Sequence, residues 1–343
     1  MENLQSYTDR LTEEQLSFYL STVNNTEELV TLSDEEKIAL VKSILDSPFL
    51  DLLCDWAFKH VFGQNLDLLE LLLRDILQMD LTIEASLPNE IDRFSERDKG
   101  AIMDVICKLN DGRRIIVEMQ RRDKDSFKDR IAYYGAAQFV KQLQRSKSYS
   151  TVHAVYVVCF TNFRLPHKTD VPGKIIYSYD LRERETGELY GEYISLNFCE
   201  LPRLAKKTMK GMTLQEGWCY ILKNMRTFVS NPRGIPEHFM PVLEASRTNS
   251  LTDKNLQQYF RAMVSDYERK DIAAAYYRRG VEEGVEKGKA EGRAEGRAEG
   301  LEETARRMLK KGFEVADIIE CTGLTEEQVR ALSYAQFTRR LPQ

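Results

Sequence analysis

The spacing of apolar residues predicts a chain in which helices and strands alternate before a long helical C-terminal part. Between residues 50 and 78, large apolar side chains recur at steps of three and four, which is the period of an amphipathic helix. Gly63 and Asn65 are expected to divide this stretch into two helices. Residues 124–146 return to the same spacing, and the pattern is again helical from about residue 200 onward.

Shorter runs rich in β-branched and aromatic residues predict the strands. Asn110, Asp111 and Gly112 form a turn sequence between two such runs, so these two strands are expected to form a hairpin. With strands before and after a helix, the order of elements favours an α/β fold with a mixed sheet flanked by helices. The expected strands cover residues 81–87, 101–109, 113–120, 152–160, 175–179 and 190–197.

Two carboxylates are expected to face one another in this hairpin. A three-residue loop, with Gly112 in the left-handed conformation, sets a register in which Asp104 stands opposite Glu118. Their Cβ atoms would then lie roughly 4.5–5.5 Å apart, and Gln120 would share their face of the sheet. A two-residue loop would instead place the two acids on opposite faces, so the pairing depends on the turn.

The surroundings of these two acids are apolar, which makes their charge costly. A hard divalent ion with oxygen ligands would stabilise them. A buried structural network with Arg114 or a helix lysine would do the same, and spacing alone does not choose between these interpretations. In the alternating pattern, Ile102, Ile106 and Ile116 lie on the carboxylate face, and Met103, Val105, Val117 and Met119 lie on the opposite face.

The hairpin resembles the core of the PD-(D/E)XK nuclease superfamily, in which an acid on one strand precedes an E-x-K motif on the next. Here the residues are Asp104 and then Glu118-Met119-Gln120, so that glutamine replaces the lysine. Other segments narrow the resemblance to the Rpn-type recombination-promoting nucleases, also called PD-(D/E)XK family transposases. It covers residues 48–200, and residues 280–335 more loosely. The matching motifs are D-x-A-F-K-x-x-F-G at residues 55–63, D-V…D-G…E-M-Q at residues 104–120, and R-x-x-Y with Arg130, Tyr133 and Tyr134, besides the glycine-repeat tail.

This resemblance implies a restriction-endonuclease-like core and an Mg²⁺- or Mn²⁺-dependent DNA endonuclease that hydrolyses phosphodiester bonds in recombination or transposition. Asp104 and Glu118 would hold the ion, together with the backbone carbonyl of Met119. Gln120 would orient the attacking water but, being uncharged, cannot neutralise the transition state. The alternative function is a weakly active or inactive nuclease fold that binds DNA or a protein and self-associates through its tail.

Further charged residues are candidates for the same site. Lys59 or Arg130 would supply the positive charge that Gln120 lacks, and Asp55 would be a third acid. For Asp55 and Lys59, a role at the start or on the surface of their helix is the alternative. Residues 101–150 carry eleven basic and six acidic residues, so DNA is expected to bind there, although a solvated charged rim fits the same pattern. The candidate DNA-binding residues are Arg114, Arg121, Arg122, Lys124 and Arg130.

The C-terminal part carries a repeat and a small helical segment. Glycine recurs every fourth residue from 280 to 300, and both a flexible linker and a helix that joins copies into a homo-oligomer fit this repeat. The last segment is predicted to form a helix, a turn and a helix, as either a DNA-binding helix-turn-helix or a merely packed hairpin. The expected domains are an acidic helical extension at 1–47, the nuclease core at 48–200, a helical region at 201–279, the repeat at 280–300 and the helical hairpin at 301–343.

The composition of the chain mainly excludes certain classes of protein. The chain has 49 Lys and Arg against 54 Asp and Glu, which excludes a protein that coats nucleic acid through bulk charge. No apolar run of about 18 residues is present, so no membrane span is expected. The first residues lack the pattern of a secretory signal, which makes the cytoplasm the expected location. The six cysteines show no zinc-binding spacing, and most of them are expected to be small core residues.

Overall fold

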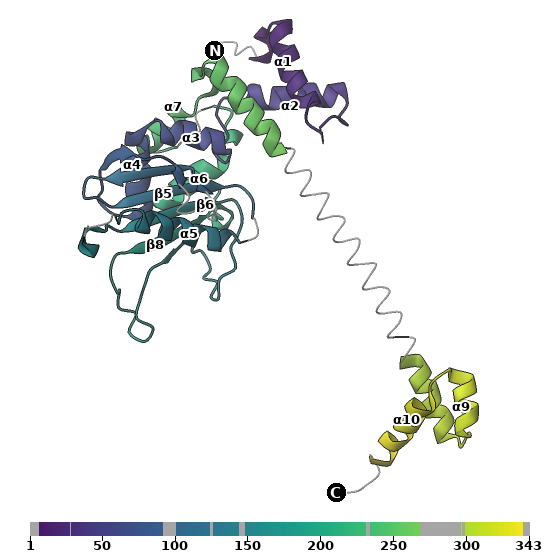
Figure 1. The fold of residues 1–343 in the computed structure, drawn as a ribbon. Helices are drawn as coiled ribbons and strands as arrows, with labels where there is room; N and C mark the ends of the chain where they lie inside the picture. The colour runs from purple at the N-terminus through teal and green to yellow at the C-terminus, as the bar shows by residue number, and fades with distance from the viewer. Residues whose placement is uncertain are drawn as a thin grey trace. The chain divides into compact units, whose positions relative to one another are not determined.

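The computed structural model describes residues 7–27, 29–91, 101–123, 126–143, 148–230, 234–267, 296 and 299–338. The chain divides into two units, Met1–Glu268 and Arg269–Gln343, and each is described by itself (Figure 1). Lys124 and residues 280–295 lie outside the described residues, and so do the expectations placed on them. Within the described ranges, no helix is long and apolar enough to cross a membrane.

The first unit is built on a six-stranded mixed sheet, which confirms the expected α/β fold. Its strand order is β1-β4-β5-β6-β8-β7. β5, β6 and β8 run parallel to one another, and the other neighbouring strands are antiparallel. The strands are β1 (Ile83–Ser86), β4 (Val105–Leu109), β5 (Arg114–Gln120), β6 (Val155–Thr161), β7 (Ile176–Tyr179) and β8 (Ile194–Glu200), beside a separate pair of β2 (Glu90–Ile91) and β3 (Ala101–Ile102).

The hairpin of β4 and β5 has the register that a three-residue loop predicts. Val105 pairs with Val117, and Lys108 pairs with Arg114. Gly112 in the loop has a φ of 89°, a conformation that favours glycine, and a Cβ atom there would lie 2.6 Å from the ring of His153. The loop therefore fixes which side chains face each other across the hairpin.

The expected strand at residues 101–109 is wrong in one respect, because the chain bends at Asp104. Met103 and Asp104 belong to neither β3 nor β4, so the alternation of side chains does not continue through them. Met103 consequently packs with Ile106 and Ile116, on the carboxylate face and not on the opposite one. Asp104 keeps its place beside β5 through side-chain contacts, which are described below.

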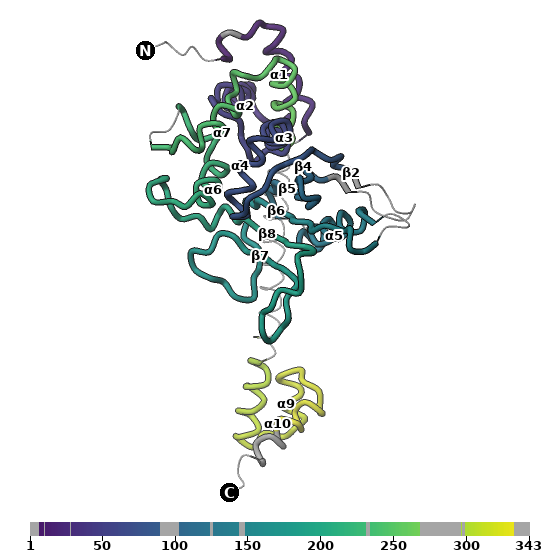
Figure 2. The backbone as a smooth tube through the Cα atoms, turned by 90° about the vertical axis from the view of Figure 1, so that its left-hand side faces the viewer, coloured from purple at the N-terminus to yellow at the C-terminus, as the bar shows by residue number. Residues whose placement is uncertain are grey.

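Helix α5 (Phe127–Val140) covers one face of the sheet, and α3 and α4 pack against the opposite face (Figure 2). Gly135 permits the close approach of α5, because a Cβ atom there would lie 2.9 Å from the Ile194 side chain of β8. On the opposite face, α3 ends at Gly63 and Asn65 caps α4 by accepting a hydrogen bond from the amide of Leu68 at 3.1 Å. This confirms the predicted break between two helices.

The remaining helices share the main core of the unit. The ring of Tyr19 in α1 packs 4.8 Å from that of Phe260, so the N-terminal helices contact helical residues 253–267. These helices are α1 (Glu13–Asn24), α2 (Asp34–Leu45), α3 (Asp55–Gly63), α4 (Leu66–Leu77), α6 (Leu214–Asn224) and α7 (Met240–Ala245). Short 3₁₀ helices cover Thr8–Arg10, Tyr149–Thr151, Leu201–Arg203, Met225–Thr227, Glu237–Phe239 and Thr248–Ser250.

The second unit contains a helix at residues 299–310, followed by α9 (Val315–Thr322) and α10 (Glu326–Thr338). Its small core contains Ala305, Ile318, Val329 and Leu332. Gly323 ends α9 with a φ of 69°, and the amide of Gln328 donates to Thr325 Oγ1 at 3.3 Å at the start of α10. The predicted order of helix, turn and helix is confirmed.

Candidate metal centre at the β4–β5 hairpin

The candidate site lies where three parallel strands end together. Gln120 of β5 pairs with Thr161 of β6, and Thr161 pairs with Glu200 of β8. In α/β sheets, ligands bind beyond the carboxyl ends of the strands. Glu118 lies two residues before this edge, on the face that α5 covers.

Asp104 and Glu118 are joined by hydrogen bonds across the hairpin. The amide of Asp104 donates to Glu118 Oε1 at 3.1 Å, and the amide of Met119 donates to Asp104 Oδ2 at 2.8 Å. Glu118 is 5% exposed, and the Asp104 side chain is 11% exposed. The structure thus brings the two acids together at a nearly buried position.

Asp55 and Lys59 of α3 lie at the same place. Lys59 Nζ is 3.1 Å from Asp104 Oδ1 and 2.9 Å from Asp55 Oδ1. Asp55 is the more exposed acid, and its carboxyl group also interacts with that of Asp104. The four-residue spacing of Asp55 and Lys59 puts both on one side of α3, and that side faces the hairpin.

Burial disfavours the charges of the two hairpin acids. It raises the pKa of Asp104 to about 7, and the carboxyl of Asp55 adds to this while Lys59 opposes it. Burial also raises the pKa of Glu118 to about 8, with a further contribution from the charge of Asp104. Two acids held this way bind protons near neutral pH unless a cation stabilises their ionised forms.

The stability of the metal-free protein is expected to fall as the pH rises from about 4 to about 8 and to level off above that. The pKa values of both acids are higher in the folded chain than in the unfolded chain, so their contribution is present at low pH and is lost as the pH passes through 7 and 8. Melting temperatures measured in EDTA across this range check the slope. An Asp104→Asn/Glu118→Gln double variant should show a flatter profile, and an equal slope in both proteins would contradict the assignment.

Gln120 and Arg130 form a second contact beside the carboxylates. Arg130 Nη2, from α5, donates to Gln120 Oε1 at 2.7 Å, and Gln120 Nε2 donates to the carbonyl of Arg122 at 3.0 Å. The guanidinium of Arg130 lies 5.4 Å from the ring centre of Phe127 and 6.0 Å from that of Tyr134. The side chain of Arg130 is therefore held from two sides.

The other described candidates for DNA binding, Arg114, Arg121 and Arg122, have partners within the protein. Arg114 is six residues before Gln120 on β5, about 20 Å along the strand, and donates to Gln138 Oε1 at 3.0 Å. Arg121 forms ion pairs with Asp51 at 3.0 Å and with Asp266 at 3.1 Å. Arg122 donates to the carbonyl oxygen of Asp266. Arg121 and Arg122 thus connect the end of β5 to helical residues 253–267.

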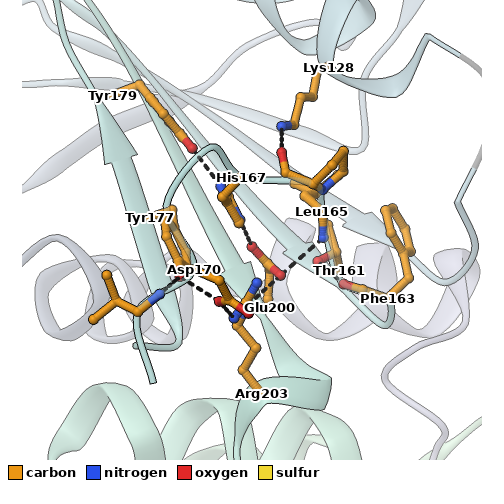
Figure 3. A network of polar contacts seen from close by, with 12 residues as sticks. Lys128, Thr161, Phe163, Leu165, His167, Asp170, Tyr177, Tyr179, Glu200 and Arg203 are labelled. Atoms are coloured by element: carbon orange, nitrogen blue, oxygen red, sulfur yellow. Dashed lines mark hydrogen bonds and ion pairs between the residues drawn. The ribbon is translucent and has the colours of Figure 1, made fainter. Parts of the chain in front are cut away.

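The same edge of the sheet holds a buried polar network that the sequence pattern did not predict (Figure 3). Glu200 is fully buried, and its carboxylate accepts hydrogen bonds from Arg203 Nε at 2.6 Å and from the amide of Leu165 at 3.0 Å. His167 Nε2 contacts the other oxygen of Glu200, and His167 Nδ1 lies 2.6 Å from the hydroxyl of Tyr179. In the sequence, the sign of this network is Glu200, an acid at the end of a largely apolar strand.

This network continues toward the candidate site through the segment that follows β6. Lys128 of α5 donates to the carbonyl of Pro166, as Figure 3 shows. The ring of Phe163 packs 5.5 Å from that of Phe127, which in turn lies against Arg130. A continuous series of contacts therefore joins Glu200 to Arg130.

The donor set at the hairpin fits a hard divalent cation. Among the described residues, no group of three or more His, Cys, Asp and Glu side chains forms a complete metal-binding cluster. Mg²⁺, however, is commonly held by one or two carboxylates and keeps several waters. Asp104 and Glu118 supply such a pair, and their raised pKa values mark a place where a cation would stabilise the ionised forms.

Comparison with known proteins gives two family matches. Residues 52–274 match the family described as PD-(D/E)XK nuclease family transposase. Residues 299–333 match the C-terminal HTH domain of the Rpn/YhgA-like nuclease family. No curated protein and no solved structure matches the chain. Since the first match spans more than half of its length, the chain belongs to the PD-(D/E)XK nuclease family transposases and carries an Rpn-type C-terminal helix-turn-helix domain.

Proposed function

We propose that this protein is a metal-dependent DNA endonuclease that hydrolyses phosphodiester bonds, with Asp104 and Glu118 as ligands of Mg²⁺ or Mn²⁺. The observation that carries the proposal is the pair of nearly buried carboxylates, each of which accepts a hydrogen bond from a backbone amide across the hairpin. Membership of a nuclease family and the C-terminal helix-turn-helix support it.

Each residue of the site has a role in this proposal. The carboxylates of Asp104 and Glu118 and the carbonyl of Met119 would hold the ion, which supplies an activated water and stabilises charge on the phosphate. Gln120 would orient the water through its amide. Lys59 lies between Asp104 and Asp55, so it can shift toward Asp55 when Asp104 binds the ion.

The DNA-binding surface is narrower in this proposal than the sequence suggested. Arg121 is given a structural role, because both of its ion pairs lie within the protein. Arg122 and Lys124 follow β5 directly, and Arg114 would contact DNA farther from the site of cleavage. Contacts of this kind to the phosphate backbone set affinity and salt dependence without reading sequence.

Plasmid cleavage tests the proposal. Full-length protein is expected to nick supercoiled plasmid with Mg²⁺ or Mn²⁺ but not with EDTA, and both Asp104→Ala and Glu118→Ala should lose this activity. Glu188→Ala, which removes an exposed acid from the connection between β7 and β8, is the matched control and should cleave like the wild type. Retention of DNA without nicking by all four proteins would replace the endonuclease with a DNA-binding module.

A further inference from the structure

We propose that Arg130 contacts the scissile phosphate and supplies the positive charge that a lysine at position 120 would otherwise provide, while Gln120 positions it. This inference rests on the proposed endonuclease function and adds a catalytic residue to it.

The described hydrogen bond of Arg130 holds its guanidinium group in place but does not offset its positive charge. Its partner is the uncharged side chain of Gln120, at 2.7 Å, and the rings of Phe127 and Tyr134 pack beside it. Arginine carries its charge at all relevant pH values and presents five donors in a rigid plane. One Nη2 hydrogen bond to Gln120 leaves further donors for an anion.

One of these donors is buried without an acceptor. In the described part of the chain, Nε of Arg130 has no hydrogen-bond partner although it is shielded from solvent. An unsatisfied buried donor typically costs about 1–3 kcal/mol, so a rotation of the guanidinium that brings Nε to an acceptor at the partly exposed end of the side chain is favourable. A phosphate oxygen is a strong acceptor, and arginine commonly binds phosphate through two parallel hydrogen bonds.

Lys59, the other candidate for this charge, is in a different situation. Its ammonium group lies 3.1 Å from one carboxylate and 2.9 Å from another, so two acids already offset its charge. Arg130 instead reaches the site from α5, on the same face of the sheet as Gln120 and Glu118. Its charge interacts with that of Glu118, but its described hydrogen bond goes to the uncharged Gln120. The chemistry of the two positions therefore assigns the phosphate contact to Arg130.

This arrangement explains why residue 120 is a glutamine and not a lysine. Gln120 accepts a hydrogen bond from Arg130 and donates one to the carbonyl of Arg122, which a single amide can do at once. A lysine at this position has no acceptor and would place an ammonium group against the guanidinium. Glutamine at 120 and arginine at 130 thus form a matched pair.

Exchanging the two side-chain types tests the pair. In the full-length protein with Mn²⁺, Arg130→Gln is expected to reduce plasmid nicking by about 100-fold or more, the effect of losing one donor to a developing negative charge. Gln120→Lys alone should also reduce it, because the two cations repel. The double variant Gln120→Lys/Arg130→Gln should recover at least about tenfold over Arg130→Gln, with the lysine now beside Glu118. Lys141→Ala, at the other end of α5, is the control for loss of one positive charge.

A binding measurement provides a readout independent of cleavage. Fluorescence anisotropy of a labelled duplex, in Ca²⁺ and at several salt concentrations, should show a smaller salt dependence for Arg130→Gln, by roughly one phosphate contact. Melting temperatures of the variants identify any that fail to fold, and Arg130→Lys then serves as the milder change.

The outcomes separate this inference from the proposed function. Equal nicking by the wild type and Arg130→Gln would reject the role of Arg130 and leave the endonuclease intact. No recovery in the double variant would reject the exchange of roles with Gln120. No nicking by the wild type, with the reduced salt dependence still present in Arg130→Gln, would reject the endonuclease but keep the phosphate contact.

Discussion

Replacing Glu118 with glutamine is expected to abolish metal-dependent cleavage and, at the same time, to raise the melting temperature of the metal-free protein. Cleavage should fall by about 1,000-fold or more, which is about 4 kcal/mol of transition-state stabilisation and of the size that a metal ion supplies. The variant gains stability because burial makes the charged form of Glu118 unfavourable in the folded chain, which raises its pKa to about 8. Glutamine keeps an oxygen that can accept the amide of Asp104 but carries no charge.

The size of this gain in stability depends on pH. Above about pH 8 the wild-type carboxylate is ionised in the folded chain, so the gain should be larger at pH 9 than at pH 6. In a unit of this size, a gain of 1 kcal/mol raises the melting temperature by roughly 2–4 °C. Differential scanning calorimetry in EDTA measures it, with Glu188→Gln as the control. A lower melting temperature for Glu118→Gln would mean that the charge of Glu118 stabilises the fold.

Replacing Arg203 with alanine is expected to destabilise the first unit by about 3–5 kcal/mol, the usual effect of leaving a buried charge unpaired. Glu200 is fully buried, and Arg203 Nε is 2.6 Å from its carboxylate. Of the remaining contacts of this carboxylate, His167 offsets the charge only when protonated, and the amide of Leu165 is neutral. Urea unfolding followed by circular dichroism measures the loss.

The matched control for this variant is Arg182→Ala. Arg182 pairs with Asp180 at 3.4 Å and is about half exposed, so its loss should change stability by less than about 1 kcal/mol. A similar loss in both variants would show that Glu200 does not need Arg203. Glu200 binds the amide of Leu165, and Phe163 in the same segment packs on Phe127 beside Arg130, so we also expect slower cleavage by Arg203→Ala at temperatures where it stays folded.

Local sequence signals predicted the hairpin well because its geometry depends on a few adjacent residues. The turn sequence ending in Gly112 sets the pairing, and the pairing brings Asp104 and Glu118 together. The bend at Asp104 was not predictable in this way, because alternation of apolar residues gives no sign of where a ladder stops. For the same reason, the last strand was expected at 190–197 but is β8, Ile194–Glu200.

Contacts between distant segments could not be read from the sequence. Arg121 looked like part of a basic surface, but it pairs with Asp266, 145 residues further along the chain. The partners of Glu200 come from separate loops, and no spacing rule links a histidine at 167 to a glutamate at 200. Composition gives the charge of a segment, whereas its partners depend on how the chain folds back on itself.

The bend at Asp104 has a consequence for how this sequence can vary. Asp104 is anchored by the amide of Met119 and by Lys59, and not by ladder pairing with the preceding residues. A change of length in the connection between β2 and β3 would therefore leave the acid in place, whereas a single added residue within β4 would turn the later side chains of that strand to the other face. The length of the chain should therefore vary more readily in that connection than between the two acids.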